Sequence, residues 1–210
     1  MFTAVLSSDA QAALAILGKS GVVANGYLAG GSALALHYGH RRSEDLDFFS
    51  PKAFSPRELA KQLRTLGTFV SSFAEGISLI GVFGGVKFSY FQYTYPVLFP
   101  TTGVFGVSVV DPRDIGAMKI AATMDRGTKR DFVDLYELVH QGVHLEELFM
   151  LYDKKFGVFE SNRISILRSI QYFDDAEAGD MPEMIRPVSW KAVKQFFSKE
   201  AMRLAKQYIE

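Results

Sequence analysis

The strongest constraint on the fold is a glycine pair between a short apolar run and a helix-sized segment. Gly30 and Gly31 follow Tyr27-Leu28-Ala29, and Ser32 comes next. Two glycines permit a tight turn and a close approach of the backbone to a ligand. Ser32 is a suitable N-cap for a helix over residues 33–38, whose exposed N–H groups suit a phosphate. We therefore expect a strand, a phosphate-binding turn and a helix in succession.

A pair of carboxylates follows that helix. Asp45 and Asp47 flank Leu46 where a strand over residues 46–49 is expected. In an extended chain, residues two apart point to the same face, so the two carboxylates converge. Like charges on one face repel unless a cation lies between them. Mg²⁺, or Mn²⁺ in its place, binds through one or two carboxylates at sites that handle nucleoside triphosphates, so the pair predicts a divalent metal site.

Composition bounds the class of protein. With 210 residues and 48% apolar residues, the chain is long enough for one domain and a modest extension. Basic and acidic residues number 23 each, so net charge favours neither nucleic acid nor membrane as a partner. The absence of cysteine excludes disulfides, thiolate metal sites and a cysteine nucleophile, and agrees with a reducing compartment. Because we find neither a signal peptide nor a membrane-spanning run, we expect a cytoplasmic protein without a membrane partner.

Capping and turn residues predict the other elements of the N-terminal half. A helix is expected over residues 8–17, with Ser8 or Asp9 as its N-cap and Gly18 as its end. Ser55-Pro56-Arg57-Glu58 forms a capping box that begins a helix ending at Gly67. β-Branched and aromatic runs then predict four strands, at Phe69–Phe73, Ile77–Phe83, Val86–Tyr93 and Val104–Val110.

The C-terminal half has a helical pattern. A helix after Asp111 places Ile115, Met118, Ala122 and Met124 on an apolar face, with Lys119 off that face. Thr128 is expected to cap the next helix. Three more helical patterns follow, and an acidic connector, residues 174–177, is expected to loop through solvent.

Two blocks of sequence resemble one family. Residues 28–36, LAGGSALAL, and 40–49, HRRSEDLDFF, resemble the signature block of the AbiEii/AbiGii-type nucleotidyltransferases, in the DNA polymerase beta-like nucleotidyltransferase superfamily. Residues 118–122, MKIAA, with Arg126 and residues 130–136, RDFVDLY, resemble that family's downstream motif. Two blocks in the right order are more specific than one. The resemblance covers residues 24–140.

The resemblance implies an α/β (α+β) fold in which helices flank a mixed β-sheet. We expect a nucleotidyltransferase-like domain over residues 1–142 and a C-terminal helical region over 143–210. The implied activity is Mg²⁺-dependent transfer of a nucleotide from a nucleoside triphosphate to an acceptor, either RNA such as tRNA or a protein side chain. Members serve as toxins in toxin–antitoxin or phage-defence pairs, so a cognate antitoxin is an implied partner.

The resemblance also assigns roles to single residues. Gly30, Gly31 and Ser32 would bind the triphosphate, and Asp45 and Asp47 would hold the metal. Lys119 and Asp131 would complete the catalytic set, with Asp131 either orienting a cation or accepting a proton from the acceptor. The nucleotide would also be contacted by three arginines close in sequence to the residues above: Arg42, Arg126 and Arg130.

One position departs from the superfamily pattern. A third carboxylate is expected on a later strand, but Ser89 occupies the best-placed position. A serine is not an anionic ligand, so either Glu75 or Asp131 stands in, or the metal site is weakened. The alternative function is therefore a nucleotidyltransferase-fold protein that binds nucleotide or a partner protein without catalysis. A metal-dependent phosphohydrolase is a third possibility.

Several candidate residues also have structural explanations. Lys119 on an amphipathic helix is most often a solvent-facing residue, and Asp131 in a first turn stabilises a helix dipole. The basic residues between 186 and 206 form the outer face of an amphipathic helix, which could follow an RNA backbone but is more often solvent-facing. Aromatic residues that alternate along a strand more often pack in the core than stack on bases. This applies to four residues here, Tyr90, Phe91, Tyr93 and Tyr95. The histidines show no zinc-binding spacing.

Overall fold

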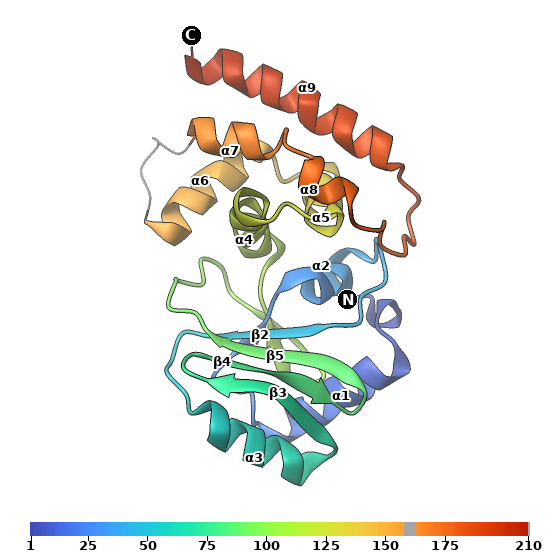
Figure 1. Cartoon of the computed structure of the whole chain (residues 1–210), viewed down its shortest axis with the longest axis vertical. Helices are drawn as coiled ribbons and strands as arrows, with labels where there is room; N and C mark the ends of the chain where they lie inside the picture. The colour runs from blue at the N-terminus through green and yellow to red at the C-terminus, as the bar shows by residue number, and fades with distance from the viewer. Residues whose placement is uncertain (158–162, 210) are drawn as a thin grey trace. The chain divides into compact units, whose positions relative to one another are not determined.

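A computed structural model describes residues 1–157 and 163–209 of the chain (Figure 1). The chain forms two compact units, Met1–Asp111 and Pro112–Glu210. The first unit contains the β-sheet, and the second is helical. The boundary expected after residue 142 concerns the extent of the catalytic domain, and it stays a prediction.

A seven-stranded mixed sheet forms the N-terminal unit. Its strand order is β3-β4-β5-β2-β1-β7-β6. β1 is parallel to β7 and β2 is parallel to β5, whereas the other neighbours are antiparallel. This confirms the expected α/β fold with a mixed sheet. The strands are β1 (Tyr27–Leu28), β2 (Leu46–Ser50), β3 (Phe69–Glu75), β4 (Ser78–Phe83), β5 (Val86–Gln92), β6 (Thr102–Val104) and β7 (Val107–Val109).

The segment expected to be one strand, Val104–Val110, is instead the turn and second strand of a hairpin. Val104 on β6 faces Val107 on β7, so only Phe105 and Gly106 form the loop. Both loop residues have positive φ, 50° and 82°. Two positive φ angles give the turn a twist that matches paired strands. The sequence prediction was wrong here because Gly106 was taken as part of the strand, and because phenylalanine gives no signal of the positive φ that Phe105 adopts in the turn.

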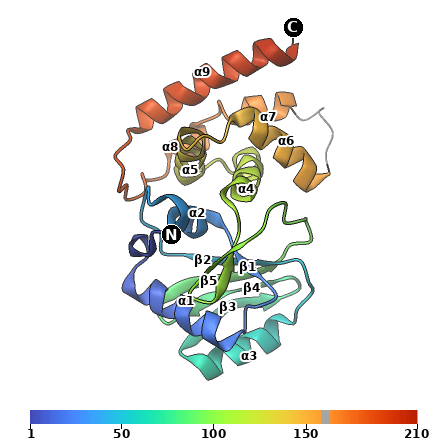
Figure 2. The same cartoon turned by 180° about the vertical axis from the view of Figure 1, so that it is seen from behind.

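Helices cover both faces of the sheet. In Figures 1 and 2, α1 (Ser8–Ser20) and α3 (Pro56–Leu66) lie on one face, and α2 (Gly30–Tyr38) lies on the other. A short 3-10 helix, Thr3–Val5, precedes α1. Alternate residues of β2, Leu46 and Phe48, are buried in the core, and Asp47 lies on the opposite side of the strand.

The first helix is longer than the sequence predicted. Ser7, not Ser8 or Asp9, caps α1 by accepting a hydrogen bond from the N–H of Ala10 at 3.2 Å. The helix continues past Gly18 to Gly21, whose φ of 71° ends it. A Cβ on Gly18 would lie 1.9 Å from the carbonyl oxygen of Phe105. Gly18 is therefore a site of close packing between α1 and the β6–β7 turn, and not a stop signal.

The C-terminal unit packs its helices around an aromatic cluster. The ring of Phe132 contacts those of Phe173, Trp190 and Phe197 at centroid distances of 5.2 to 5.8 Å. None of the described helices is both long and apolar enough to span a membrane. The helices are α4 (Pro112–Asp125), α5 (Lys129–His140), α6 (Leu145–Phe156), α7 (Arg163–Ser169), α8 (Asp174–Glu177) and α9 (Trp190–Ile209).

The acidic connector is not a loop, as the sequence had suggested. Residues 174–177 form the short helix α8, which buries Ala176. Glu177 accepts a hydrogen bond from Lys194 on α9 at 2.5 Å. The apolar Ala176 and the pairing of an acid with the basic face of α9 explain why this acidic segment is ordered against the helices.

Close packing at Gly18 gives the first prediction. Gly18→Ala should lower the free energy of unfolding by about 1–3 kcal/mol, because backbone atoms of the β6–β7 turn must move, and this exceeds the gain in helix propensity of about 1 kcal/mol. Gly103→Ala is the control, since no atom lies within 4 Å of its Cβ. Its change should stay within about 0.5 kcal/mol. Urea unfolding of both variants measures the difference, and equal effects would contradict the packing role.

Candidate active site

The first turn of α2 lies directly against Asp47. Gly30 has a φ of 66°, and a Cβ there would lie 3.2 Å from Oδ2 of Asp47. A Cβ on Gly31 would lie 2.1 Å from Nη2 of Arg41. Both glycines thus bring the positive end of a helix against charged side chains. The expected closeness of the glycine turn and the second carboxylate is present in the structure.

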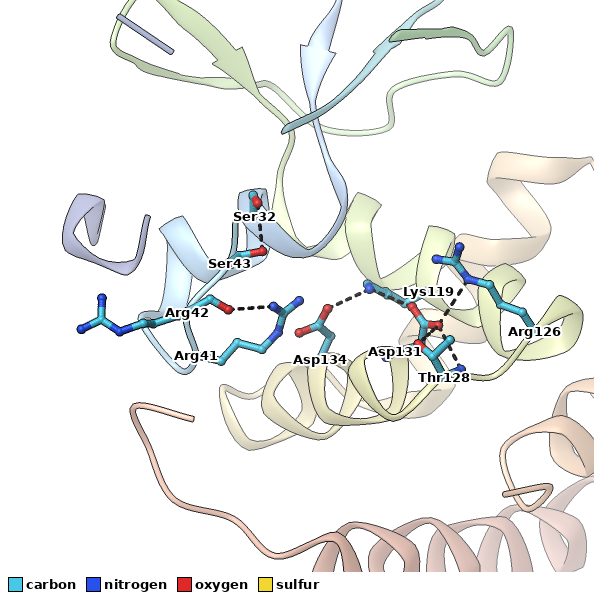
Figure 3. Close-up of polar contacts among 9 residues, drawn as sticks. All are labelled: Ser32, Arg41, Arg42, Ser43, Lys119, Arg126, Thr128, Asp131 and Asp134. Atoms are coloured by element: carbon cyan, nitrogen blue, oxygen red, sulfur yellow. Dashed lines mark hydrogen bonds and ion pairs between the residues drawn. The ribbon is translucent and has the colours of Figure 1, made fainter. Parts of the chain in front are cut away.

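Ser32 has a different local role from the one predicted. The helix begins at Gly30 with Ala29 as its N-cap, so Ser32 lies inside the first turn. Its hydroxyl donates to the backbone carbonyl of Asp45 and shares a hydrogen bond of 2.9 Å with the hydroxyl of Ser43 (Figure 3). The buried Ser32 therefore ties the start of α2 to the loop that leads into β2.

Asp47 is paired with Ser89 across neighbouring strands. The two residues are opposite each other in the parallel β2–β5 pair, and Ser89 Oγ donates to Asp47 Oδ1 at 2.5 Å. Ser89 thus occupies the position beside Asp47 where the third carboxylate was sought. The other oxygen of Asp47, Oδ2, is the one nearest Gly30. Asp45 directly precedes β2 and is partly exposed.

Neither proposed substitute for the third carboxylate fits. Glu75 ends β3, and β4 and β5 lie between that strand and β2. Asp131 uses both carboxylate oxygens in contacts within its own unit. The described residues contain no cluster of three or more His, Cys, Asp or Glu side chains with metal-binding geometry. Asp47 with its neighbouring hydroxyl nevertheless offers oxygen ligands that suit Mg²⁺, which binds through one or two carboxylates and retains water or phosphate oxygens as its other ligands.

The loop before β2 contains two arginines with different surroundings. Arg42 is exposed, and its Nη1 donates to the carbonyl of Ala4 at 3.3 Å. Arg41 is buried, lies against Gly31 and donates to the carbonyl of Arg42 at 3.0 Å (Figure 3). Sequence reasoning placed both arginines in a cationic loop before the aspartates and selected Arg42, not Arg41, as the nucleotide-binding residue. Two adjacent arginines in a loop give no sequence signal that separates them, because the chain path decides which one turns toward the helix.

A second cluster lies in the C-terminal unit, around a buried lysine. Lys119 Nζ contacts Asp131 Oδ1 and Asp134 Oδ2, each at 2.8 Å (Figure 3). All three side chains are buried, so Lys119 is not the solvent-facing residue of the structural explanation. Sequence reasoning missed Asp134 as a partner. The signal was the three-residue spacing from Asp131, which places both acids on one side of a helix.

Asp131 also caps its helix. Its Oδ2 accepts hydrogen bonds from the N–H of Thr128 at 3.2 Å and from the Thr128 hydroxyl at 2.6 Å, which completes a capping box. Burial alone would raise the pKa of the Asp131 carboxyl, but Lys119, Thr128 and Arg126 together hold that pKa below its ordinary value of 3.8. Asp131 is therefore an anion that orients Lys119 and begins α5, and these contacts favour orientation over proton transfer.

Two other predicted cations flank this cluster. Arg126 is largely exposed, with Nε 3.6 Å from Oδ2 of Asp131. Arg130 is exposed in the first turn of α5. Within the C-terminal unit, the structure thus brings Lys119, Arg126 and Asp131 together. Within the N-terminal unit, it brings Gly30 against Asp47 and Ser32 against the backbone of Asp45, whereas Arg42 turns to Ala4.

The basic face of the last helix is partly neutralised. Lys194 pairs with Glu177, and Arg203 pairs with both Glu146 and Glu200. These pairs favour the structural explanation for this helix over an RNA-binding face.

The buried lysine gives the second prediction. Lys119→Met should cost about 3–5 kcal/mol of unfolding free energy, because two buried carboxylates lose their cation. Lys61→Met is the matched control, since Lys61 makes an exposed pair with Glu58 at 2.8 Å. That change should cost less than about 1 kcal/mol. Urea unfolding at neutral pH compares the two, and a small loss for both would show that Lys119 is not structurally important.

The lowered pKa of Asp131 gives a third prediction, on acid stability. The pKa of Asp131 in the folded chain lies below its value in the unfolded chain. As pH falls, the unfolded chain therefore binds more protons than the folded chain does. The stabilisation is complete above about pH 5, clear of the unfolded pKa of about 3.9, and is lost as pH falls through the folded pKa. Asp131→Asn, which retains capping ability, should therefore unfold with a weaker dependence on pH below about pH 5 than the wild type. Glu75→Gln is the control, and an equal slope for Asp131→Asn and the wild type would disprove the linkage.

Comparisons with known proteins agree with this architecture. A family model described as nucleotidyl transferase AbiEii toxin, type IV toxin–antitoxin system, matches residues 13–208. The match extends beyond the resemblance seen at residues 24–140 and includes the C-terminal helices, which the sequence interpretation had left unassigned. An Aquifex aeolicus (strain VF5) protein described as uncharacterized, aq_aa25, is 34% identical over 210 residues, with 98% of each chain covered.

Solved structures share the fold. JHP933 from Helicobacter pylori is 19% identical, with a TM-score of 0.58 and coverage of 96% of this chain and 94% of the other. MenT4, a nucleotidyltransferase toxin from Mycobacterium tuberculosis H37Rv, is 18% identical, with a TM-score of 0.56 and coverage of 93% and 84%. At these identities, the likeness concerns the fold.

The family model covers most of the chain, and it confirms the expected family and enzyme class. The chain belongs to the AbiEii family of nucleotidyl transferase toxins.

Proposed function

We propose that the protein transfers a nucleotide from a nucleoside triphosphate to a hydroxyl group of an RNA acceptor, such as tRNA, and that it does so with Mg²⁺ or Mn²⁺. The observation that carries this proposal is the contact between Gly30 and Asp47. A carboxylate suited to a metal lies against a helix start suited to a polyphosphate. In the reaction, the acceptor oxygen bonds to the α-phosphorus, pyrophosphate leaves, and the hydroxyl proton passes to solvent.

The residues of the N-terminal unit have assigned roles in this proposal. Asp45 and Asp47 would hold the metal, which supplies positive charge to the reacting phosphate when bound. The N–H groups at Gly30 and Gly31 bind the polyphosphate. Arg41 adds a buried positive charge beside these N–H groups. Ser32 acts through its bond to the Asp45 carbonyl, which fixes the loop that presents the first carboxylate.

The residues of the C-terminal unit bind phosphate and position cations. Lys119 is a cation held in one orientation by Asp131 and Asp134, which are positioning residues. Arg126 and Arg130 are exposed arginines that suit phosphate groups of a nucleotide or an RNA. Little covalent chemistry is needed from the protein in phosphoryl transfer, so fixed cations are its main contribution.

The biological setting follows from the family. Growth inhibition through nucleotide transfer to RNA would make the protein a toxin of a toxin–antitoxin or phage-defence pair, with an antitoxin as its partner. RNA acceptors and the absence of cysteine both suit the cytoplasm.

A rival function rests on one observation, the serine beside Asp47. Because Ser89 donates to Asp47 and adds no charge, the site has one anion fewer than a three-carboxylate site. A protein of this kind would bind nucleotide or a partner without transfer. Calorimetry with a triphosphate and Mg²⁺ would then give binding, while labelled transfer would be absent. Release of phosphate or pyrophosphate without any acceptor would instead indicate a phosphohydrolase.

Removal of one carboxylate gives the fourth prediction. Asp47→Asn should lower the rate of labelled nucleotide transfer to total tRNA by at least about 100-fold, the usual effect of deleting a group that stabilises transition-state charge. Glu58→Gln, an acid-to-amide change at an exposed position on α3, on the face of the sheet opposite α2, should leave the rate unchanged. The assay uses each labelled triphosphate in turn with Mg²⁺ or Mn²⁺. Absence of labelled product from the folded wild type in every combination would disprove transfer to tRNA.

A further inference from the structure

The outer strands of the sheet expose an apolar surface. Four side chains on β3 and β4 form it: Val70 is 65% exposed, Phe73 47%, Ile80 39% and Val82 40%. On the opposite face of these strands, Phe69, Leu79 and Phe83 are buried in the core. Exposed apolar side chains on edge strands favour aggregation, and contiguous patches of them commonly mark binding sites. This surface is therefore a candidate binding site.

The strand register joins this surface to the candidate active site. Asp47 on β2 is opposite Ser89 on β5, Ser89 is opposite Ile80 on β4, and Ile80 is opposite Phe73 on β3. Residues in one such row point to the same face. Neighbouring strands are about 4.8 Å apart, so the row extends about 14 Å outward from Asp47. The exposed apolar surface thus begins at Ile80, two strands from the carboxylate, and the buried Ser89 lies between them in the same row.

A cation and an aromatic ring flank the row on the same face. Lys87 and Phe91 lie two residues to either side of Ser89 on β5, and two-residue spacing preserves the face. Lys87 is exposed and opposite Val82, which is opposite Val70. Apolar and aromatic side chains beside a cation are the composition of surfaces that bind single-stranded nucleic acid, where bases stack and phosphates pair with the cation.

The direction of the row suits the acceptor and not the triphosphate. The polyphosphate is assigned to the start of α2, which directly follows β1. β1 and β5 lie on opposite sides of β2. Phosphoryl transfer places the attacking and leaving oxygens roughly in line, on opposite sides of the phosphorus. An acceptor that attacks while pyrophosphate leaves toward β1 therefore approaches over β5, β4 and β3.

We propose that these residues, Val70, Phe73, Ile80, Val82 and Lys87, form an acceptor platform for the unpaired end of an RNA. Bases at that end cover Phe73 and Ile80, and a phosphate pairs with Lys87, so that the terminal hydroxyl is directed to Asp47. This inference rests on the nucleotidyl transfer proposed above. A protein partner would also cover apolar side chains, but its binding would not require the row to begin at the reactive carboxylate.

Binding measurements test the platform separately from catalysis. The probes are a short RNA hairpin with an unpaired 3′ end, the same hairpin with an unpaired 5′ end, and a blunt one. Phe73→Ser should raise the Kd for one overhang by roughly 5- to 100-fold, the loss of one stacking contact. Ile80→Ser should raise this Kd by a smaller factor, because an aliphatic side chain packs against a base without stacking. Ile16→Ser on α1 is the matched control, because Ile16 is also exposed, at 41%. Lys87→Gln should reduce the slope of log Kd against log salt by about 0.7.

The outcomes separate this inference from the proposed function. Calorimetry with a triphosphate should give the same Kd for the wild type and for all four variants. If transfer fails in the wild type but Phe73→Ser and Ile80→Ser still weaken RNA binding, the activity is disproved and the RNA-binding role of the platform is supported. Three results would overturn the platform. The first is unchanged RNA binding in the variants, and the second is weakened triphosphate binding. The third is a wild-type dimer that these variants dissociate while RNA binding is retained.

Discussion

The contact between Gly30 and the Asp47 carboxylate is the constraint on which the N-terminal unit depends. A side chain at Gly30 would meet Asp47 Oδ2 at 3.2 Å and would also be strained by the positive φ. The helix start can therefore approach the carboxylate only with glycine at this position. Hydrogen bonds from Ser32 to the Asp45 carbonyl and from Ser89 to Asp47 then fix the two ends of the same short segment. One turn, one loop and one strand are held together by side chains that also define the candidate site.

The main constraint in the C-terminal unit is a different one, the burial of charged side chains. Lys119 is buried, and its positive charge would be costly there without partners. Asp131 and Asp134 supply two anions, and Asp131 also satisfies the N–H of Thr128 at the start of α5. The helix cap and the ion pairs thus share one carboxylate. Structural and functional explanations of Asp131 are not exclusive, since the contacts that begin the helix also fix the direction of the lysine.

The sequence predicted the features that depend on local signals and failed where distant contacts decide. The end of α2 at Tyr38, the end of α3 before Gly67 and the N-cap at Ser55 follow from neighbouring residues, and they appear as expected. Of the capping box predicted at Ser55, the structure shows the bond from the N–H of Glu58 to the Ser55 hydroxyl, whereas the Glu58 carboxylate pairs with Lys61. Gly18 looked like a stop because its packing partner, Phe105, lies far along the chain. Lys119 looked solvent-facing because its two acidic partners lie on the next helix. Ser32 looked like a cap because the sequence does not disclose that its hydroxyl reaches the loop before β2. In the candidate site, residue types were predictable and their partners were not.

Ser89 shows how one strand pairing affects both chemistry and architecture. A third carboxylate at this position would face Asp47 directly across the β2–β5 pair, and without a bound cation the two anions would repel each other. Serine removes that repulsion and adds a hydrogen bond to Oδ1, so that Asp47 is held in place before any ligand arrives. The same hydrogen bond occupies one of the oxygens that a metal would use. Loss of one anion weakens the attraction of the site for a divalent ion, whereas preorganisation of the remaining carboxylate strengthens it. The serine is therefore compatible with an active enzyme in which the nucleotide substrate would supply most of the ligands of the metal.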